Sequence, residues 1–249
     1  DIDWDTLLEG TADYFKPVPL ESNHPSYVLY TSGSTGGPKG MVHGTGGWMT
    51  GVYESARLVF DMKPDDIFFC TADIGWVTGH SYTVLAPLLH GATTVMFGGT
   101  PTYPAADRLW QIIAQHRVSI LYTAPTALNT LAAAGDHLPA NHDLSSLRLL
   151  GTVGEPISDP TWRWYHQHIG KGKLPIVDTW WQTETGAIMA SSIPGATPGK
   201  PAWAGRPLPG VWGEHALDEV DQAVEHGGAI QELGPGQLFL FDTALELQL

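Results

Sequence analysis

Short apolar runs alternate with longer amphipathic stretches along most of the chain. Apolar runs bounded by glycine, proline or acidic residues are typical of buried strands, whereas apolar residues three or four positions apart indicate helices. The pattern predicts strands at residues 27–30, 67–70, 92–97, 118–122, 147–150 and 175–178. It predicts helices at residues 46–60, 81–89, 107–116, 125–134 and 160–169.

The alternation of strands and helices indicates the fold class. From about residue 27 to residue 180 the order favours an α/β fold, with a mostly parallel sheet flanked by helices. In such sheets ligands bind beyond the carboxyl ends of the strands. Polar stretches that contain glycine follow four predicted strands, at residues 31–40, 71–80, 151–156 and 179–186. We therefore predict that these four loops share one rim of the sheet.

The composition changes after residue 190. Prolines 194, 198, 201, 207 and 209 stand there among glycines, which is typical of an irregular connection. We expect a lead-in at residues 1–24, an α/β core at 25–193, a Pro/Gly-rich linker at 194–213 and an incomplete β-rich subdomain at 214–249. The last of these includes a predicted strand at 237–241.

Composition and charge exclude several classes of protein. A hydrophobic content of 43% with ten tryptophans in 249 residues indicates a globular protein. No apolar run reaches the length of about 18 residues that a membrane span needs. The net charge of −14 argues against duplex nucleic acid as a partner. The single cysteine, Cys70, suits a reducing compartment, so we expect a cytoplasmic location. The sequence carries no signal for an oligomeric state.

The segment Thr31-Ser-Gly-Ser-Thr-Gly-Gly-Pro-Lys-Gly40 is the strongest candidate for chemistry. Its glycines allow backbone N–H groups to turn inward, its hydroxyls add donors, and Lys39 adds a positive charge, which together favour phosphate binding. It is not a Walker A loop, because Pro38 and Gly40 occupy positions where that pattern needs glycine and a hydroxyl. The alternative is a flexible Gly/Ser turn without a ligand.

Two further motifs follow later strands. Gly154-Glu-Pro156 can be a plain turn or a flat backbone surface for a purine ring. Residues 178–184, Asp-Thr-Trp-Trp-Gln-Thr-Glu, combine hydroxyls, an amide and carboxylates around two indoles, of which we expect one to belong to the core. Glu184 can hold Mg²⁺ beside phosphates, or it can be a solvated loop carboxylate. The histidines lack metal-site spacing, and no G-x-S-x-G elbow indicates a serine hydrolase.

These three motifs together resemble those of the adenylate-forming enzymes. Within that superfamily, residues 72–82 (Ala-Asp-Ile-Gly-Trp-Val-Thr-Gly-His-Ser-Tyr), 121–126 and 194–198 resemble the AMP-forming acetyl-CoA synthetases. The resemblance covers about residues 25–211. It implies that a carboxylate attacks the α-phosphate of Mg-ATP to give an acyl-AMP, from which the CoA thiol then displaces AMP. The implied substrates are acetate, ATP and CoA, with Mg²⁺ as the metal.

The resemblance also implies roles for individual residues. Thr31, Lys39 and Glu184 would be catalytic, and Glu184 would be the metal ligand. The bulky Trp181 would restrict the acid to a small one. The phosphates would be held by Thr31, Ser32, Gly33, Ser34, Thr35, Gly36 and Lys39, and the rest of the nucleotide by Gly154, Glu155, Pro156, Asp178, Thr179, Trp180, Trp181, Gln182 and Thr183. The acyl group would be lined by Val77, Thr78, Val153 and Trp181, and CoA would meet Thr78 and Ala124.

The sequence also departs from the family pattern. Thr102 stands where acetyl-CoA synthetases commonly have an asparagine near CoA. The later ribose-binding motif and the adenylation lysine of the family have no counterpart here, and the chain begins with Asp1, so we expect a fragment that is inactive alone. The alternatives are a propionyl- or other short-chain acyl-CoA synthetase, and a truncated, non-catalytic nucleotide-binding protein.

Overall fold

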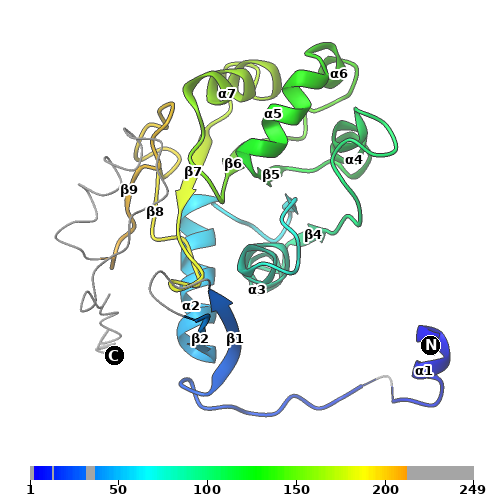
Figure 1. Ribbon diagram of the computed structural model, residues 1–249, viewed down its shortest axis with the longest axis vertical. Helices are drawn as coiled ribbons and strands as arrows, with labels where there is room; N and C mark the ends of the chain where they lie inside the picture. The colour runs from blue at the N-terminus through cyan, green and yellow to red at the C-terminus, as the bar shows by residue number, and fades with distance from the viewer. Residues whose placement is uncertain (1–2, 13, 32–36, 212–249) are drawn as a thin grey trace.

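A computed structural model describes residues 3–12, 14–31 and 37–211 (Figure 1). Its main sheet has the strand order β4-β3-β5-β6-β7-β8-β9. The first five of these strands are mutually parallel, and β8 and β9 run antiparallel to their neighbours, so the predicted α/β fold with a mostly parallel sheet is confirmed. The strands are β3 Ile67–Cys70, β4 Thr93–Val95, β5 Ile120–Thr123, β6 Leu149–Thr152, β7 Ile176–Trp180, β8 Ala190–Ser191 and β9 Arg206–Pro207.

The predicted helices are present, with small shifts at their ends. Two of them divide into a π-helical and an α-helical part, namely η1 with α3 and α7 with η2, which the sequence pattern did not indicate. A short α1 stands in the predicted lead-in and buries no residue. The helices are α1 Trp4–Leu8, α2 Thr45–Val59, η1 Gly79–Leu85, α3 Ala86–Leu89, α4 Arg108–His116, α5 Pro125–Ala134, α6 His137–Ala140, α7 Asp159–Trp164 and η2 Tyr165–Ile169.

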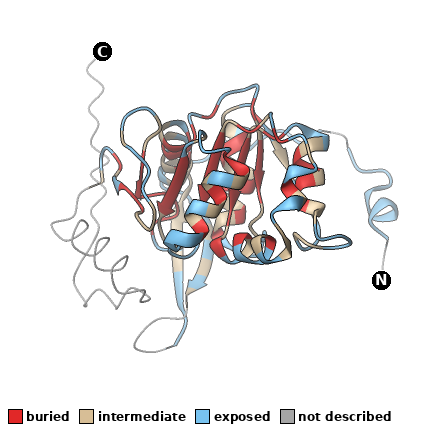
Figure 2. Cartoon of the chain, turned by 90° about the horizontal axis from the view of Figure 1, so that it is seen from above, coloured by how far each residue is buried: buried red, intermediate tan, exposed pale blue. Residues whose placement is uncertain are grey.

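Both faces of the sheet are buried, as Figure 2 shows from above. Phe68 and Tyr122 point to one face, where they pack in a cluster with residues of α2, η1 and α3. Phe69 and Leu121, their neighbours along the strands, point to the other face and pack with residues of α4, α5, α7 and η2. Because successive side chains of a strand alternate between faces, strands covered on both sides must be apolar at nearly every position. That requirement explains the unbroken apolar runs in the sequence.

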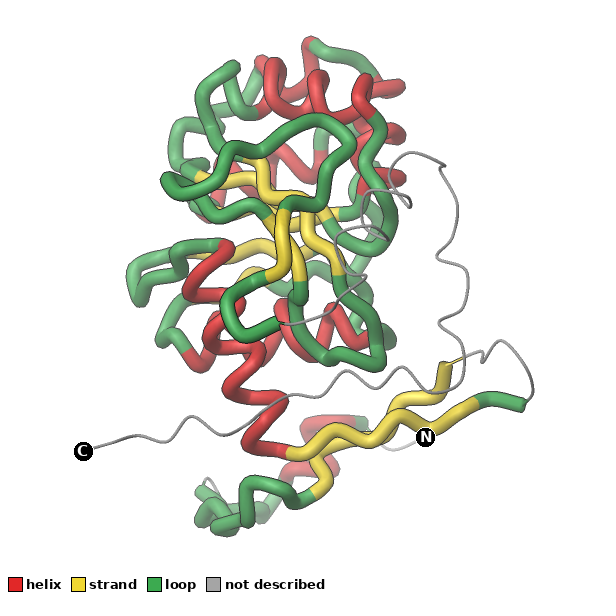
Figure 3. Tube along the Cα trace, turned by 90° about the vertical axis from the view of Figure 1, so that its left-hand side faces the viewer, coloured by secondary structure: helices red, strands yellow, loops and turns green. Residues whose placement is uncertain are grey.

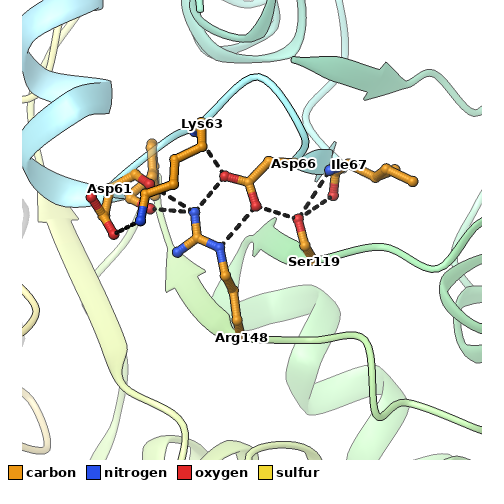
Figure 4. Close-up of polar contacts among 7 residues, drawn as sticks. Asp61, Lys63, Asp66, Ile67, Ser119 and Arg148 are labelled. Atoms are coloured by element: carbon orange, nitrogen blue, oxygen red, sulfur yellow. Dashed lines mark hydrogen bonds and ion pairs between the residues drawn. The ribbon is translucent and has the colours of Figure 1, made fainter.

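A polar network closes the amino end of the sheet (Figure 4). Asp66, the residue just before β3, is only 4% exposed. Arg148 donates to both of its carboxylate oxygens, and the Ser119 hydroxyl and the Lys63 N–H donate to it at 2.7 and 2.9 Å. Arg148 also donates to the carbonyl of Asp61 at 2.8 Å. The network therefore joins the segments that enter β3, β5 and β6.

The first predicted strand does not belong to the main sheet. β1 (Pro25–Thr31) pairs antiparallel with β2 (Lys39–Gly44), and this hairpin projects from the body at the start of α2 (Figure 3). The prediction that the loop at 31–40 shares the rim of the parallel sheet is therefore wrong in its connectivity. The prediction failed because the sequence pattern did not indicate β2. Lys39 and Gly40, which begin this strand, belong to a glycine-rich segment that is typical of a loop. Residues 32–36 lie outside the described part of the chain.

The C-terminal stretch is described as far as residue 211. β9 lies within the predicted Pro/Gly-rich linker, and its pairing with β8 extends the sheet to that point. The strand predicted at 237–241 and the subdomain predicted at 214–249 lie outside the described residues. The domain boundaries stay predictions.

Candidate functional site

The strand order creates a switch point at β3, where the chain first moves to β4 and then returns to β5 on the opposite side. Connections leave the two neighbouring strands in opposite directions at such a point, which opens a crevice at their carboxyl ends. A pocket of about 440 Å³ lies there. Its lining comes from segments that follow β3, β4, β5 and β6, namely Thr71, Ala72, Thr100, Pro101, Thr102, Ala124, Thr126, Ala127, Thr130 and Val153.

Helix α5 begins at the wall of this pocket. Ala124, its N-cap residue, offers no side-chain cap, and Pro125 at the first helical position has no N–H to satisfy. The carboxylate of Glu155 fills this role from the loop after β6, because it accepts hydrogen bonds from the Thr126 N–H at 2.7 Å and from the Thr126 hydroxyl. The predicted adenine segment 154–156 is thereby tied to the pocket, and Ala124 and Thr102 both line it.

Asp178 is a buried carboxyl in β7, only 5% exposed. The Thr152 hydroxyl on the neighbouring strand β6 donates to its Oδ1 at 2.7 Å. Burial raises the pKa of Asp178 to about 7, against the smaller opposing effect of the hydrogen bonds from Thr152 and from the Thr179 N–H. A carboxyl in this state can accept a further hydrogen bond from a ligand or donate one, depending on its protonation.

The residues after Asp178 take part in a directed chain of hydrogen bonds. Thr179 donates its hydroxyl to the Thr152 carbonyl at 2.8 Å, so at the 2.7 Å contact between Tyr122 and Thr179 the Tyr122 hydroxyl is the donor. Tyr122 in turn accepts from the Trp181 Nε1 at 3.4 Å. Trp181 also packs edge-on against Tyr82 of η1, with ring centroids 5.1 Å apart. Trp181 packs against the core without being fully buried, and Trp180 is half-buried.

The loop that contains Glu184 is anchored on both sides. Within it, the Thr185 and Gly186 N–H groups bond to the Gln182 carbonyl, which leaves Glu184 exposed. The Ser81 hydroxyl of η1 donates to the Gly186 carbonyl at 2.7 Å, and the Tyr82 hydroxyl accepts from the Ile188 N–H at 2.7 Å. Side chains of a π-helical turn therefore fix the end of the loop, a placement that recurs at functional sites.

The hairpin meets the same loop from the other side. His43 on β2 lies with its Nε2 atom 2.7 Å from the Thr183 carbonyl, 140 positions away along the chain. Lys39 pairs with Thr31 across the hairpin, so both described ends of the predicted phosphate loop lie on one antiparallel ladder, where the Lys39 side chain is exposed. The predicted phosphate residues Ser32, Gly33, Ser34, Thr35 and Gly36 lie outside the described part of the chain.

The predicted acyl-pocket residues divide into two places. Val153 and Trp181 belong to one apolar cluster, together with Tyr82 of η1. Val77 is buried two residues before η1, and Thr78 is the N-cap residue of η1. The two places meet through the contact of Tyr82 with Trp181. The assignment of these residues to an acyl group stays a prediction.

Sequence reasoning missed several residues that organise this region. Tyr122 lies inside an apolar strand, where a lone hydroxyl gives a weak signal, although it belongs to the family-like segment 121–126. Thr152 stands in the polar stretch 151–156, where nothing distinguishes its hydroxyl from that of an ordinary turn residue. Thr126, Ser81 and Tyr82 also stand in quoted motifs, and their polar groups could have been singled out. The role of His43 depends on a contact with residue 183, and no local pattern reports a contact at that separation.

The comparisons with known proteins are consistent with this geometry. The family model described as AMP-binding enzyme matches residues 2–229. The chain belongs to the family of AMP-binding enzymes. It is 57% identical over 208 residues to an acetyl-coenzyme A synthetase of Chlorobaculum tepidum, covering 84% of this chain and 32% of that protein. It is 52% identical over 232 residues to an acetyl-coenzyme A synthetase of Pasteurella multocida, covering 92% of this chain and 35% of that protein.

The chain spans about a third of the length of these curated relatives. Three of the predicted loops lie at the carboxyl ends of β3, β6 and β7. His43 joins the hairpin to the loop after β7. The described residues contain no cluster of three or more histidine, cysteine or acidic side chains that could hold a metal ion alone. Within the same residues, no helix combines the length and apolar character needed to cross a membrane.

Proposed function

We propose that this chain forms the nucleotide-binding core of an AMP-forming acetate–CoA ligase. An acetate oxygen attacks the α-phosphorus of ATP, which gives acetyl-AMP and releases pyrophosphate. The CoA sulfur then attacks the acetyl carbonyl carbon and releases AMP, leaving acetyl-CoA. This chemistry depends on positioning and charge neutralisation, and it needs no nucleophile from the protein.

The observation that carries this proposal is the meeting of the loops after β3, β4, β5 and β6 around one pocket at the switch point, beside β7, whose Asp178 is bonded to Thr152 of β6. On this proposal Gly154, Glu155 and Pro156 line the adenine, and residues 178–183 enclose the rest of the adenosine and the α-phosphate. CoA approaches through the pocket that Ala124 lines, and Thr78 would also meet it. The names of the relatives, acetyl-coenzyme A synthetase, support acetate as the acid.

Lys39, Thr31 and Glu184 would act on the phosphates. Lys39 is exposed and supplies positive charge at the start of β2, next to the glycine-rich segment. Mg²⁺ usually keeps several waters and takes one or two carboxylates besides the substrate phosphates, so the single exposed carboxylate of Glu184 fits such an ion. The ion would neutralise phosphate charge when bound. The single cysteine supports a cytoplasmic location.

The size of the acid would be set by Trp181. Its indole is held in place from two sides, by the edge-on packing against Tyr82 and by the Nε1 contact with Tyr122. A fixed indole wall beside Val153 leaves room for a short acyl chain, and a longer one would clash. The preference for acetate therefore rests on one side chain.

Calorimetric titration of this chain tests the proposal. We expect saturable binding of Mg-ATP and of a non-hydrolysable acetyl-adenylate mimic. Lys39→Ala should weaken Mg-ATP binding by about 10- to 100-fold, because a charge-assisted contact to phosphate is lost. Lys173→Ala, which removes the same charge at an exposed turn before β7, should change nothing.

The same titration with a longer acyl-adenylate mimic tests the acyl pocket. Trp181→Gly should improve its binding relative to the acetyl mimic. Tighter binding of the longer mimic to the unsubstituted protein would favour a propionyl- or other short-chain acyl-CoA synthetase. Absence of nucleotide binding by the folded chain would contradict the proposed role of these loops.

A further inference from the structure

The hairpin that leads to the glycine-rich segment has few connections to the rest of the protein. β2 continues directly into α2, and Thr45 at the start of α2 bonds through its N–H and hydroxyl to the His24 carbonyl, both at 2.8 Å. Among the described residues, the bond between His43 and Thr183 is the hydrogen bond that joins a hairpin strand to a loop of the main sheet. His43 therefore provides the direct polar link between the hairpin and that loop, in addition to the packing of Tyr27 against Trp48 of α2 and His80 of η1.

The contact of His43 is directional. Its partner is a carbonyl oxygen, which can only accept, so the Nε2 atom of His43 carries the hydrogen and donates at 2.7 Å. The ring also stacks on Tyr27 of β1, with centroids 4.9 Å apart, and Tyr27 meets Trp48 of α2 edge-on at 4.5 Å. These contacts fix the orientation of the imidazole from both strands of the hairpin and from α2.

Gly186 leaves room for this arrangement. Its φ of +71° is a conformation that residues with a side chain rarely adopt, and a Cβ atom at this position would lie 2.9 Å from Cε1 of His43 and 3.2 Å from Trp48. The Gly186 carbonyl is meanwhile held by Ser81, which also accepts from the Trp48 Nε1 at 3.0 Å. The loop can therefore approach the hairpin closely only because residue 186 is glycine.

We propose that His43 is a positioning residue, which holds the hairpin with Lys39 against the loop with Glu184 so that both reach the phosphates of one nucleotide. The inference rests on the proposed function, since it assigns the β- and γ-phosphates to the hairpin. It adds a residue that touches no substrate. Loss of His43 should affect some ligands and not others. Only a ligand that extends from residues 178–183 to the hairpin requires the hairpin and the loop to be correctly placed relative to each other.

The test compares ATP with AMP. AMP needs the loops after β6 and β7, whereas Mg-ATP also needs the hairpin. In calorimetric titrations of the 249-residue chain, we expect His43→Phe to weaken Mg-ATP binding about 3- to 10-fold, the effect of one lost hydrogen bond, and to leave AMP binding unchanged. His43→Gln should retain most of the ATP affinity, because its amide Nε2 can donate to the same carbonyl.

Two further variants separate this role from a general loss of structure. Gly186→Ala keeps His43 but forces the loop away from it, so it should reproduce the selective loss of ATP affinity. Val42→Thr changes the neighbouring exposed position on the opposite face of β2 and should bind both nucleotides normally. Amide hydrogen exchange without nucleotide should become faster in residues 41–44 and 182–186 of His43→Phe, and should not change in Val42→Thr.

The outcomes distinguish the two proposals. If His43→Phe and the unsubstituted protein have the same ratio of ATP to AMP affinity, the proposed role of His43 is overturned, while the proposed function stands. An equal loss of both affinities is one such case. Unchanged amide exchange in His43→Phe would overturn this role as well. Failure of the unsubstituted protein to bind either nucleotide would overturn the proposed function, and the role of His43 with it.

Discussion

Two aspartates at opposite ends of the sheet are both almost inaccessible to solvent, yet their pKa values shift in opposite directions. Asp66 at the amino end is 4% exposed and Asp178 near the carboxyl end is 5% exposed. Burial alone would raise the pKa of Asp66, but the donors Arg148, Ser119 and the Lys63 N–H outweigh it and hold that pKa below its usual value. Asp178 has the Thr152 hydroxyl and one backbone N–H, and burial raises its pKa to about 7.

The difference has two causes: Asp66 receives more hydrogen bonds, two of them from the positively charged Arg148, and Asp178 lies deeper in the protein. The amino end satisfies its carboxylate completely and belongs to the scaffold. The carboxyl end leaves hydrogen-bonding capacity free, beside the loops to which we assign the nucleotide. Polar groups that are incompletely satisfied in a folded protein mark places where stability is given up for binding.

Replacing Arg148 with methionine should leave the carboxylate at the amino end of the sheet incompletely satisfied, as Asp178 is at the carboxyl end. The substitution leaves Asp66 buried without its cationic partner, which typically costs 3–5 kcal/mol for a fully buried pair. Because the Arg148 side chain is 34% exposed, we expect a smaller loss of about 2–4 kcal/mol in urea unfolding at pH 7. Arg148→Lys keeps the charge but not the bidentate contact, so its stability should lie between that of the unsubstituted protein and that of Arg148→Met.

The pH dependence of Arg148→Met sharpens this test. In the unsubstituted protein the lowered pKa of Asp66 contributes stability above the pKa of the unfolded chain, near 4, and this contribution is lost as the pH falls through the folded pKa. In the variant that contribution should disappear, so the loss relative to the unsubstituted protein should shrink on acidification. A loss independent of pH would contradict the comparison.

At the carboxyl end of the sheet, Asp178→Asn should remove the free-energy cost of burying an ionised carboxylate. The pKa of Asp178 is about 7 in the folded protein, against an ordinary value of 3.8, so Asp178 favours folding least when the pH exceeds 7, because its ionised form is disfavoured in the folded state. Stability relative to the unsubstituted protein should therefore increase by about 1–3 kcal/mol between pH 5 and pH 8. Urea unfolding at the two pH values measures this change, and a decrease between them would contradict the raised pKa.

Tyr122→Phe should have the smallest effect on stability and a more specific effect on structure. It removes the donor to Thr179 and the acceptor for the Trp181 Nε1 without changing the packed ring. We expect a loss of about 1 kcal/mol and a changed ratio of acetyl- to longer acyl-adenylate affinity, because Trp181 is less firmly held. Phe68→Leu, a core change on the same face, serves as the control and should leave that ratio unchanged.

The sequence predicted local structure better than the connections between segments. Helix α5 was predicted at its observed residues, because Pro125 and Gly135 mark its ends, and the parallel strands were predicted from apolar runs that burial on both faces requires. The hairpin was wrongly assigned because Lys39 and Gly40 have no apolar pattern. The side-chain partners of Asp66 lie 53 and 82 positions away, and such contacts leave no trace in local periodicity.

The hairpin also differs from the sheet in how it can form during folding. Its strands pair residues 8 to 19 positions apart, as the pairs of Thr31 with Lys39 and of Pro25 with Gly44 show, whereas β3 and β5 join residues more than 50 positions apart. Local antiparallel pairing takes microseconds, while long-range parallel pairing is slower. An isolated two-stranded hairpin is only marginally stable, so we expect it to form early and transiently. It is then retained only when β7 has found its place and the loop beyond it presents Thr183 to His43.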